Sequence, residues 1–212
     1  MYTGIVQATA TVTAVTPHLG HTAITLANAG EIFDDAQIGA SISIDGTCLT
    51  VTAQSAGTAS FDISAHTAKL TTLNALEVGD IVNIERSHKS SMENGGHNLY
   101  GHTHGTATIT SWDTIGDTAH VTIALSPDAI PYFFPKGFIG LHGCSLTVDE
   151  VDEVRSQLSL NLIPETLRLT TFKQKRIGDL LNYEIDQTTR TIVDTIQRAM
   201  KSQERGIGAQ HH

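Results

Sequence analysis

Residues 44–51, IDGTCLTV, decide the fold because they return at residues 141–148 as LHGCSLTV. Three further blocks repeat in the same order: GIVQATATVT at 4–13 returns as GHTHGTATIT at 101–110, HTAKLTT at 66–72 as ETLRLTT at 165–171, and VGDIVNIE at 78–85 as IGDLLNYE at 177–184. The offsets run only from 97 residues (141 minus 44) to 99 residues (165 minus 66). A period this long indicates two copies of a whole domain. Two like domains offer two like pockets, and we expect chemistry where the copies differ.

Each half is predicted to be a small barrel of short strands. The first half is rich in alternating Thr, Val, Ile and Ala, which is typical of strands. The expected strands are 2–15, with a kink at Gly4, then 21–26, 41–45, 48–54, 58–63 and 80–85. Asp45-Gly46 is a hairpin signal, and Gly79-Asp80 marks another break. Six short strands in about 85 residues favour a closed barrel without exposed edges.

The fold class is therefore all-β, with two tandem six-stranded closed barrels and a C-terminal amphipathic α-helix. We predict an N-terminal barrel over residues 1–94, which includes a polar linker at 87–94, and a second barrel over 95–185. A helix over 186–205 follows, because Ile192, Val193, Ile196 and Met200 recur at helical spacing. Thr188 or Thr189 is expected to cap it. The helix has no counterpart in the first half, so it packs on its own chain or, as we favour, on copies of itself.

Composition limits the classes of partner. The chain has 212 residues, with 13 basic and 22 acidic side chains and a net charge of −9, which argues against nucleic acid as a partner. No apolar run approaches the roughly 20 residues that span a bilayer, and the first residues show no secretory signal. Two cysteines favour free thiols in the cytoplasm. His211 and His212, native or an added tag, carry no weight here.

Cys48 and Ser145 occupy the same position of the two repeats, while Cys144 falls one residue earlier. A lone cysteine is most often a small buried hydrophobe. Here the two halves present a thiol and a hydroxyl at one structural position, and this difference suits two pockets with different tasks.

Histidines gather at His88, His97, His102 and His104. A metal site is one interpretation, but no cysteine or carboxylate follows at a recognised ligand spacing. Chance histidines on a surface strand are a second interpretation. We favour the third, that they line a pocket for an aromatic, hydrogen-bonding ligand, and we predict no metal.

Threonines also recur in both halves, although strand propensity explains many of the others. The recurring pairs are Thr67 and Thr166, Thr71 and Thr170, and Thr72 and Thr171.

Together these residues resemble the riboflavin synthase family. The resemblance covers essentially the whole chain and is specific in combination. It rests on MYTGIV at 1–6, GAS at 39–41 leading to CLTV at 48–51, GGH at 95–97 with GH at 101–102, KGFIG at 136–140 leading to SLTV at 145–148, and IPETL at 163–167.

The resemblance implies an enzyme that needs no metal or redox cofactor. Riboflavin synthases are trimers held by the C-terminal helix, and each barrel binds one 6,7-dimethyl-8-ribityllumazine. An active site forms between the N-terminal barrel of one chain and the C-terminal barrel of a neighbour. Two stacked lumazines exchange a four-carbon unit there and give riboflavin and 5-amino-6-(ribitylamino)uracil. Whether a lumazine synthase capsid surrounds the trimer stays open.

By the same resemblance, Ser41, Cys48, His97, His102 and His142 are the catalytic candidates. The expected lining of the N-barrel pocket is Gly4, Ile5, Val6, Ser41, Cys48, Leu49, Thr50, Asp62, Ile63, Ser64, Ala65, His66 and Thr67. The expected lining of the C-barrel pocket is Gly101, His102, Thr103, Lys136, Ser145, Leu146, Thr147, Leu160, Asn161, Leu162, Ile163, Pro164 and Glu165.

Three positions depart from the family pattern. Tyr2 stands where Phe is common, which should matter little, and His66 stands where Glu is usual. His142 replaces an aspartate that is often assigned an active-site role. If His142 acts as a base, activity should fall below about pH 6.5.

A non-catalytic lumazine- or flavin-binding protein, such as the lumazine proteins of luminous bacteria, is the alternative. Those relatives usually have one competent barrel. Both motifs are intact here and the C-terminal helix is present, so the enzyme is favoured.

Overall fold

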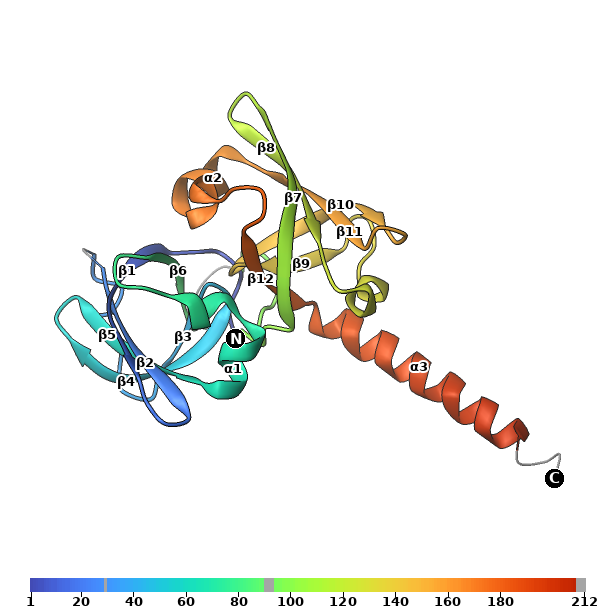
Figure 1. The fold of residues 1–212 in the computed structure, drawn as a ribbon, viewed down its shortest axis with the longest axis horizontal. Helices are drawn as coiled ribbons and strands as arrows, with labels where there is room; N and C mark the ends of the chain where they lie inside the picture. The colour runs from blue at the N-terminus through green and yellow to red at the C-terminus, as the bar shows by residue number, and fades with distance from the viewer. Residues whose placement is uncertain (29, 90–93, 209–212) are drawn as a thin grey trace.

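The structure is a computed structural model that describes residues 1–28, 30–89 and 94–208, with side chains up to residue 202. Residues 90–93 of the predicted linker, together with His211 and His212, lie outside the described residues. Two closed antiparallel barrels stand side by side, and a long helix extends away from them (Figure 1). The predicted fold class is confirmed. No helix of the described part is long and apolar enough to cross a membrane.

Each barrel has six strands and a short helical insertion before its last strand. The first barrel contains β1 (Ala8–Pro17), β2 (His21–Ala27), β3 (Ser41–Ile44), β4 (Thr47–Ser55), β5 (Thr58–Ser64), α1 (Ala65–Leu70), η1 (Thr72–Ala75) and β6 (Ile81–Arg86). The second contains β7 (Gly105–Ile115), β8 (Thr118–Ala124), η2 (Pro127–Tyr132), β9 (Phe138–Leu141), β10 (Cys144–Asp152), β11 (Gln157–Leu162), α2 (Pro164–Leu169), η3 (Thr171–Gln174) and β12 (Leu180–Ile185). The neighbour orders are β1-β2-β5-β4-β3-β6 and β10-β11-β8-β7-β12-β9.

Alternation along the strands builds one apolar core inside each barrel. Val12, Leu26 and Phe61 are fully buried in the first core, and Ile139 and Leu160 in the second. Because successive strand residues point to opposite sides, the residues between these face outward. Strand side chains that are free for contacts outside the cores must therefore lie mainly on the outer side of each barrel.

The first strand starts later than predicted. The expectation was a strand from residue 2, yet β1 begins at Ala8 and Tyr2 forms only an isolated bridge with Leu99. Two causes are visible: Gly4 has a φ of +72°, which ends the extended run, and the Glu85 carboxylate binds the backbone N–H groups of Thr3 and Gly4. The segment before β1 thus runs outside the strands of its own barrel until Gln7, whose N–H donates to the Ile84 carbonyl of β6 at 2.9 Å.

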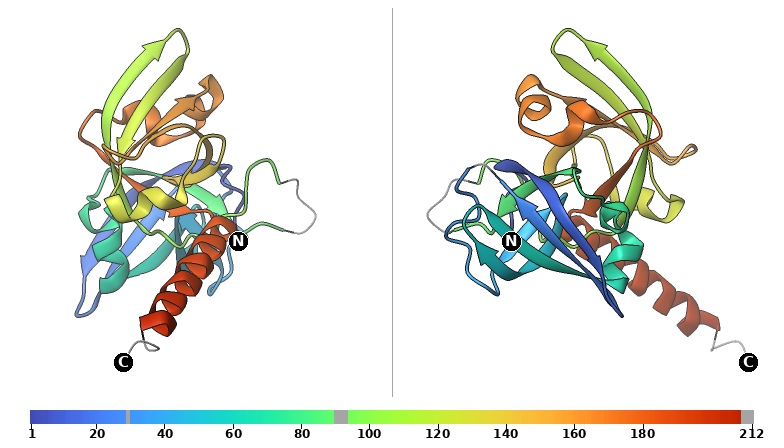
Figure 2. Two further views of the ribbon diagram at one scale, coloured as in Figure 1. Left: turned by 90° about the vertical axis from the view of Figure 1, so that its right-hand side faces the viewer. Right: turned by 60° about the vertical axis from the view of Figure 1, so that its left-hand side comes forward.

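The barrels meet at their equivalent hairpin tips. Asp45 and His142 have φ angles of 45° and 52°, each followed by a glycine, and a Cβ on Gly46 would lie 2.7 Å from the Gly143 nitrogen. Asn83 donates from Nδ2 to the His142 carbonyl, and Asn182 donates to the Asp45 carbonyl, each at 2.9 Å. These reciprocal bonds fix one barrel against the other. Figure 2 shows the ribbons of the two barrels next to each other from two further directions.

The last helix, α3 (Gln187–Gly208), follows β12 directly. Asp186 caps it, because its Oδ1 accepts from the Thr189 backbone N–H at 2.7 Å; the prediction that a threonine caps this helix is wrong. Tyr132 donates a 2.6 Å hydrogen bond to Asp194, which ties α3 to η2. Ile192, Ile196 and Met200 remain more than half exposed.

Candidate functional site

Two pockets occupy equivalent places on the barrels, where the strand after the hairpin meets the short helix. The N-barrel pocket has a volume of about 360 Å³ and is lined by Thr47, Cys48, His66, Thr67, Leu70, Thr71, Gly101, His102 and Thr103. The C-barrel pocket, of about 180 Å³, is lined by Gly4, Ile5, Val6, Cys144, Ser145, Leu146, Ile163, Glu165, Thr166, Leu169 and Thr170. Each pocket therefore combines its own barrel with a segment that leads into the other barrel.

The leading segments cross between the barrels, which reverses part of the prediction. Gly4 was expected in the N-barrel pocket, but its carbonyl accepts a 2.8 Å hydrogen bond from the Ser145 N–H of the C-barrel. Gly101 was expected in the C-barrel pocket, but its carbonyl accepts a 2.9 Å bond from the Cys48 N–H. Ile5 and Val6 likewise line the C-barrel pocket, and His102 and Thr103 line the N-barrel pocket.

Glycine is required at both crossings. Gly4 and Gly101 have φ angles of +72° and +70°, and a Cβ on either would lie 2.5 Å from the Cβ of Ser145 or Cys48. Real Cβ atoms do not approach so closely, and the left-handed backbone adds strain for any other residue. The backbone thus reaches the two pockets at a distance that only glycine permits.

Two buried carboxylates hold the crossings. Glu85 accepts from the backbone N–H groups of Thr3 and Gly4 at 2.6 and 3.0 Å, and Glu184 accepts from those of Tyr100 and Gly101 at 2.7 and 2.9 Å. Burial raises the pKa of both groups, that of Glu184 to about 6. The recurring Asn-x-Glu of the fourth repeat block was the signal for this arrangement, and sequence reasoning did not use it.

The recurring threonines close the short helices beside the pockets. Thr71 donates from Oγ1 to the Thr67 carbonyl at 2.8 Å, and Thr170 donates to the Thr166 carbonyl at 2.7 Å. Each Oγ1 of Thr71 and Thr170 also accepts from a backbone N–H of the next helical turn. These threonines therefore recur because they end the short helices. Thr71 and Thr170 also line the two pockets, and the sequence analysis did not include them among the expected pocket residues.

Cys48 provides a thiol group to the N-barrel pocket. It is half-buried, and its Sγ accepts a hydrogen bond of 3.1 Å from the Tyr2 hydroxyl. His102 lines the same pocket, so a thiol and an imidazole face one cavity.

Ser145 provides the matching hydroxyl of the C-barrel pocket. His97 lies with its Nδ1 2.6 Å from the Ser145 Oγ, and its backbone N–H donates to the same oxygen at 3.2 Å. The imidazole stacks on Phe138 with ring centres 4.9 Å apart. Burial lowers the pKa of His97, which favours the neutral ring. A neutral imidazole beside a hydroxyl is suited to proton transfer.

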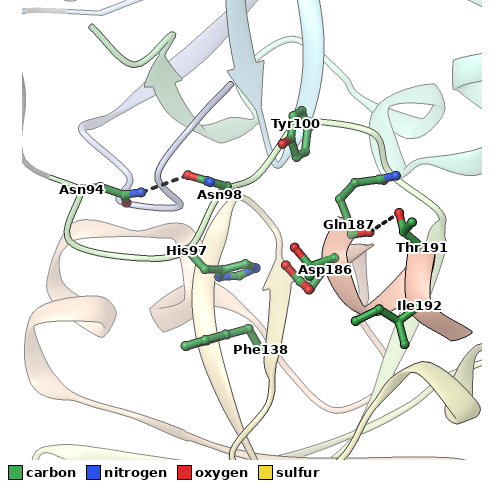
Figure 3. Close-up of a pocket in the computed structure, with 10 residues that line it drawn as sticks. Asn94, His97, Asn98, Tyr100, Phe138, Asp186, Gln187, Thr191 and Ile192 are labelled. Atoms are coloured by element: carbon green, nitrogen blue, oxygen red, sulfur yellow. Dashed lines mark hydrogen bonds between the residues drawn. The ribbon is translucent and has the colours of Figure 1, made fainter. Parts of the chain in front are cut away.

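A third cavity of about 660 Å³ opens on the other side of His97 (Figure 3). Its wall consists of the segment between the barrels, Phe138 of β9 and the start of α3, with Asp186 and Gln187 opposite His97. The Nε2 of His97 is buried and has no hydrogen-bond partner among the described residues. His97 therefore stands between the C-barrel pocket and this cavity.

His142 does not fit its predicted role. It is 1% exposed between the barrels, lines neither pocket, and has its Nε2 3.3 Å from Asp45 Oδ1. Its Nδ1 accepts from the Asn182 N–H at 3.4 Å, which leaves the proton on Nε2. Burial lowers its pKa well below the usual value and raises that of Asp45 to about 7. The prediction that activity falls below about pH 6.5 because His142 acts as a base therefore does not fit the structure.

The structure brings together about half of the predicted lining. One pocket is lined by the predicted residues Cys48, His66, Thr67, Gly101, His102 and Thr103. The second is lined by the predicted residues Gly4, Ile5, Val6, Ser145, Leu146, Ile163 and Glu165. Strand alternation turns four predicted residues into the barrel cores, which corrects their assignment: Leu49, Ile63, Leu160 and Leu162. The remaining predicted residues lie on nearby surface outside the two pockets: Ser41, Thr50, Asp62, Ser64, Ala65, Lys136, Thr147, Asn161 and Pro164.

The histidine cluster of the sequence separates in space. His104 lies 2.9 Å from an Arg190 guanidinium nitrogen, and burial lowers its pKa to about 4. His88 donates its backbone N–H to the Met1 carbonyl. In the described ranges, no group of three or more His, Cys, Asp or Glu residues has the geometry of a metal site.

Comparison with known proteins agrees with this arrangement. A family model described as the lumazine binding domain matches residues 3–87 and again 100–186. The riboflavin synthase of Escherichia coli (strain K12) is 37% identical, over 98% of this chain and 97% of its own length. That of Bacillus subtilis (strain 168) is 32% identical, over 94% and 91%.

Solved structures show the same fold. The structure described as LumP complexed with riboflavin has a TM-score of 0.79 at 25% identity, over 87% of this chain and 99% of that chain. The LumP complex with 6,7-dimethyl-8-(1'-D-ribityl) lumazine has a TM-score of 0.78 at 24% identity, with the same coverage. From its two matched domains and its full-length relatives, the chain belongs to the riboflavin synthase family of lumazine-binding proteins.

Proposed function

We propose that the protein is a riboflavin synthase. It would take two molecules of 6,7-dimethyl-8-ribityllumazine and move a four-carbon unit from one to the other, in the last step of riboflavin biosynthesis. The products are riboflavin and 5-amino-6-(ribitylamino)uracil. The observation that supports this best is the pair of related but unlike pockets, because two copies of one substrate must end as different products. The reaction is a transfer in which no metal or redox cofactor takes part.

Orientation would supply much of the rate. Holding two lumazines face to face turns a bimolecular step into an intramolecular one, which is worth about 7–11 kcal/mol of barrier at best. The two crossing glycines set backbone directly against Cys48 and Ser145, so ligands in both pockets rest on rigid walls. Rigid walls are what such positioning needs.

Proton transfer would begin the chemistry. The C7 methyl group of a lumazine is acidic because its anion delocalises into the ring system, so a positioned base is sufficient. His97 with Ser145 serves the C-barrel pocket in this proposal, and His102 with Cys48 serves the N-barrel pocket. In the C-barrel pocket, the Ser145 hydroxyl would take up the methyl proton as it passes its own proton to the neutral His97 ring, whose Nδ1 lies 2.6 Å away.

We also propose a homotrimer held by α3. The helix projects from the barrels (Figure 1), and Ile192, Ile196 and Met200 leave an apolar stripe uncovered on it. Three such stripes can cover one another, which brings the N-barrel pocket of one chain to the C-barrel pocket of the next. Truncation after Asp186 should then give monomers in analytical ultracentrifugation, and a truncated chain that remains trimeric would refute this role.

Free thiols at Cys48 and Cys144 agree with a cytoplasmic setting.

The test of the function is direct. Purified protein and 6,7-dimethyl-8-ribityllumazine should yield riboflavin, with two lumazines consumed for each riboflavin formed, as followed by chromatography. Tight lumazine binding without turnover would instead support a ligand carrier like LumP, whose fold this chain shares. The two retained pockets and α3 favour the enzyme.

A further inference from the structure

The Tyr2 hydroxyl is a polar group that the proposed reaction does not yet use. Tyr2 is 1% exposed, and its hydroxyl lies 3.1 Å from Cys48 Sγ. The ring is fixed at its base, because the Tyr2 N–H donates to the Leu99 carbonyl at 2.7 Å and the Leu99 N–H donates back at 3.0 Å. A phenol held this firmly is a directed hydrogen-bond donor.

The hydroxyl of Tyr2 donates in that bond and the sulfur accepts. Removal from water raises the pKa of the Tyr2 phenol well above its usual value of 10, so the donor keeps its proton throughout the physiological range. With the phenol proton directed at the sulfur, the S–H of Cys48 points elsewhere. Cys48 lines the N-barrel pocket, so the bond limits how the thiol can present itself to a ligand.

The segment that carries Tyr2 also reaches the other pocket. Two residues further on, the Gly4 carbonyl accepts from the Ser145 N–H at 2.8 Å. One short stretch, residues 2–6, thus touches the thiol of one pocket and forms a wall of the other. A displacement of this segment at either pocket would therefore change the geometry of the other pocket as well.

The second repeat has no equivalent hydroxyl. Leu99 occupies the position of Tyr2 there, at the offset of 97 residues (99 minus 2), and Leu99 cannot form hydrogen bonds from its side chain. Ser145 instead has the His97 ring beside it. The Tyr2 hydroxyl therefore adds to the difference between the two pockets.

We propose that Tyr2 is a positioning residue of the N-barrel pocket, whose hydroxyl holds the Cys48 sulfur in place for the reacting lumazine. Contrary to the expectation stated above for this position, tyrosine and phenylalanine are then not equivalent here. The part of this inference that concerns turnover rests on the proposed riboflavin synthase activity. The part that concerns the sulfur does not, because thiol reactivity can be measured without substrate.

Tyr2→Phe tests the contact with almost no change of shape. Only Cys48 is accessible to a thiol reagent, since Cys144 is 4% exposed. The hydroxyl stabilises the anionic sulfur, so iodoacetamide should alkylate Cys48 more slowly in Tyr2→Phe at pH 7.5. We expect a decrease of about 2- to 10-fold, the range of one hydrogen bond, read by mass spectrometry of the native protein. A rate equal to or above that of the wild type would overturn the proposal.

Tyr183→Phe is the matched control, because it removes another buried tyrosine hydroxyl, at 5% exposure, from the far barrel. It should leave the alkylation rate unchanged. A similar decrease in this control would mean that general loosening, and not the Tyr2 contact, controls the thiol, and would also count against the proposal.

A double-mutant cycle covers turnover. Tyr2→Phe should lower kcat/KM by about 2- to 10-fold in the wild-type background and have no further effect in Cys48→Ala. An equal decrease in both backgrounds would show that Tyr2 acts without the sulfur. If the wild type makes no riboflavin, the proposed function fails, yet the alkylation result still decides whether Tyr2 holds Cys48.

Discussion

The N-barrel and C-barrel pockets share one frame and differ in the groups placed on it. Both have a crossing glycine, a buried glutamate that holds the crossing and a threonine that closes the short helix. On that frame, the N-barrel pocket has Cys48 beside a tyrosine hydroxyl, and the C-barrel pocket has Ser145 beside an imidazole. The two halves therefore share the residues that shape the pockets and differ in the side chains that could react.

The largest effect should come from removing one pocket at a time. Gly101→Ala places a methyl group against Cys48 and should close the N-barrel pocket, while Gly4→Ala should close the C-barrel pocket. Each should lower turnover by roughly 100-fold or more, because misplacement by about 1 Å is enough for that loss. Lumazine fluorescence titration should show one binding site lost per chain in each variant.

Gly116→Ala is the control for backbone strain. Gly116 has a φ of +59°, but no atom lies within 4 Å of the position that a methyl group would take there, so this variant carries the strain without the clash. It should retain both binding sites and nearly full turnover. Loss of both sites from a single crossing variant would show that the pockets are not separable.

The frame itself should be symmetric in energy. Asn83 and Asn182 each bind the other barrel's hairpin carbonyl, and each side-chain oxygen accepts from the N–H of Thr171 or Thr72. Removing either amide leaves two buried groups unpaired, which costs about 2–3 kcal/mol of unfolding free energy. Asn83→Ala and Asn182→Ala should therefore be similar in urea denaturation. A gap above about 1.5 kcal/mol would break the symmetry.

The reactive groups should be unequal. His97→Gln removes the ring beside Ser145 and should lower turnover by roughly 100-fold, the lower end of the contribution of an acid–base group. His18→Gln, a change on the outer surface of the first barrel, should have no such effect. Steady-state rates of riboflavin formation measure both, and equal rates in the two variants would remove His97 from the mechanism.

The last prediction concerns the pH dependence of stability and the buried carboxyl group between the barrels. The pKa of Asp45 is raised to about 7, above the unfolded value of about 3.9, so the folded state keeps a proton that the unfolded chain releases. Stability should therefore be lost as the pH rises from about 4 to 7. Relative to Asp45→Asn, the wild type should lose up to about 4 kcal/mol over this window, because the two pKa values differ by about 3 units and each unit corresponds to about 1.4 kcal/mol. Parallel stability curves for the two proteins would contradict this assignment.

The sequence predicted the frame better than the site. Four repeat blocks with nearly constant offsets were enough for two barrels, and they aligned Cys48 with Ser145. They did not reveal the crossing, because a repeat shows which residues are equivalent and says nothing of which barrel a segment contacts. Gly4 and Gly101 were consequently exchanged between the pockets.

Two further misses have simple physical causes. Leu49 follows the pocket residue Cys48 on β4, and Ile63 lies between the outward-facing Asp62 and Ser64 on β5, so the period of two already places both in the core. His142 aligned with Asp45, and both lie at hairpin tips that face each other across the barrels. A contact between two equivalent tips depends on how the barrels pack, which no local pattern in the chain expresses.

Two unlike pockets from neighbouring chains act together in the proposed reaction, and complementation tests this most directly. Gly4→Ala and Gly101→Ala chains should each be nearly inactive alone. When the two are co-expressed, mixed trimers should contain sites with one intact N-barrel pocket and one intact C-barrel pocket, and about a quarter of the wild-type rate should return if assembly is random. If the mixture remains as inactive as either variant alone, the two pockets do not meet across chains and the central claim is contradicted.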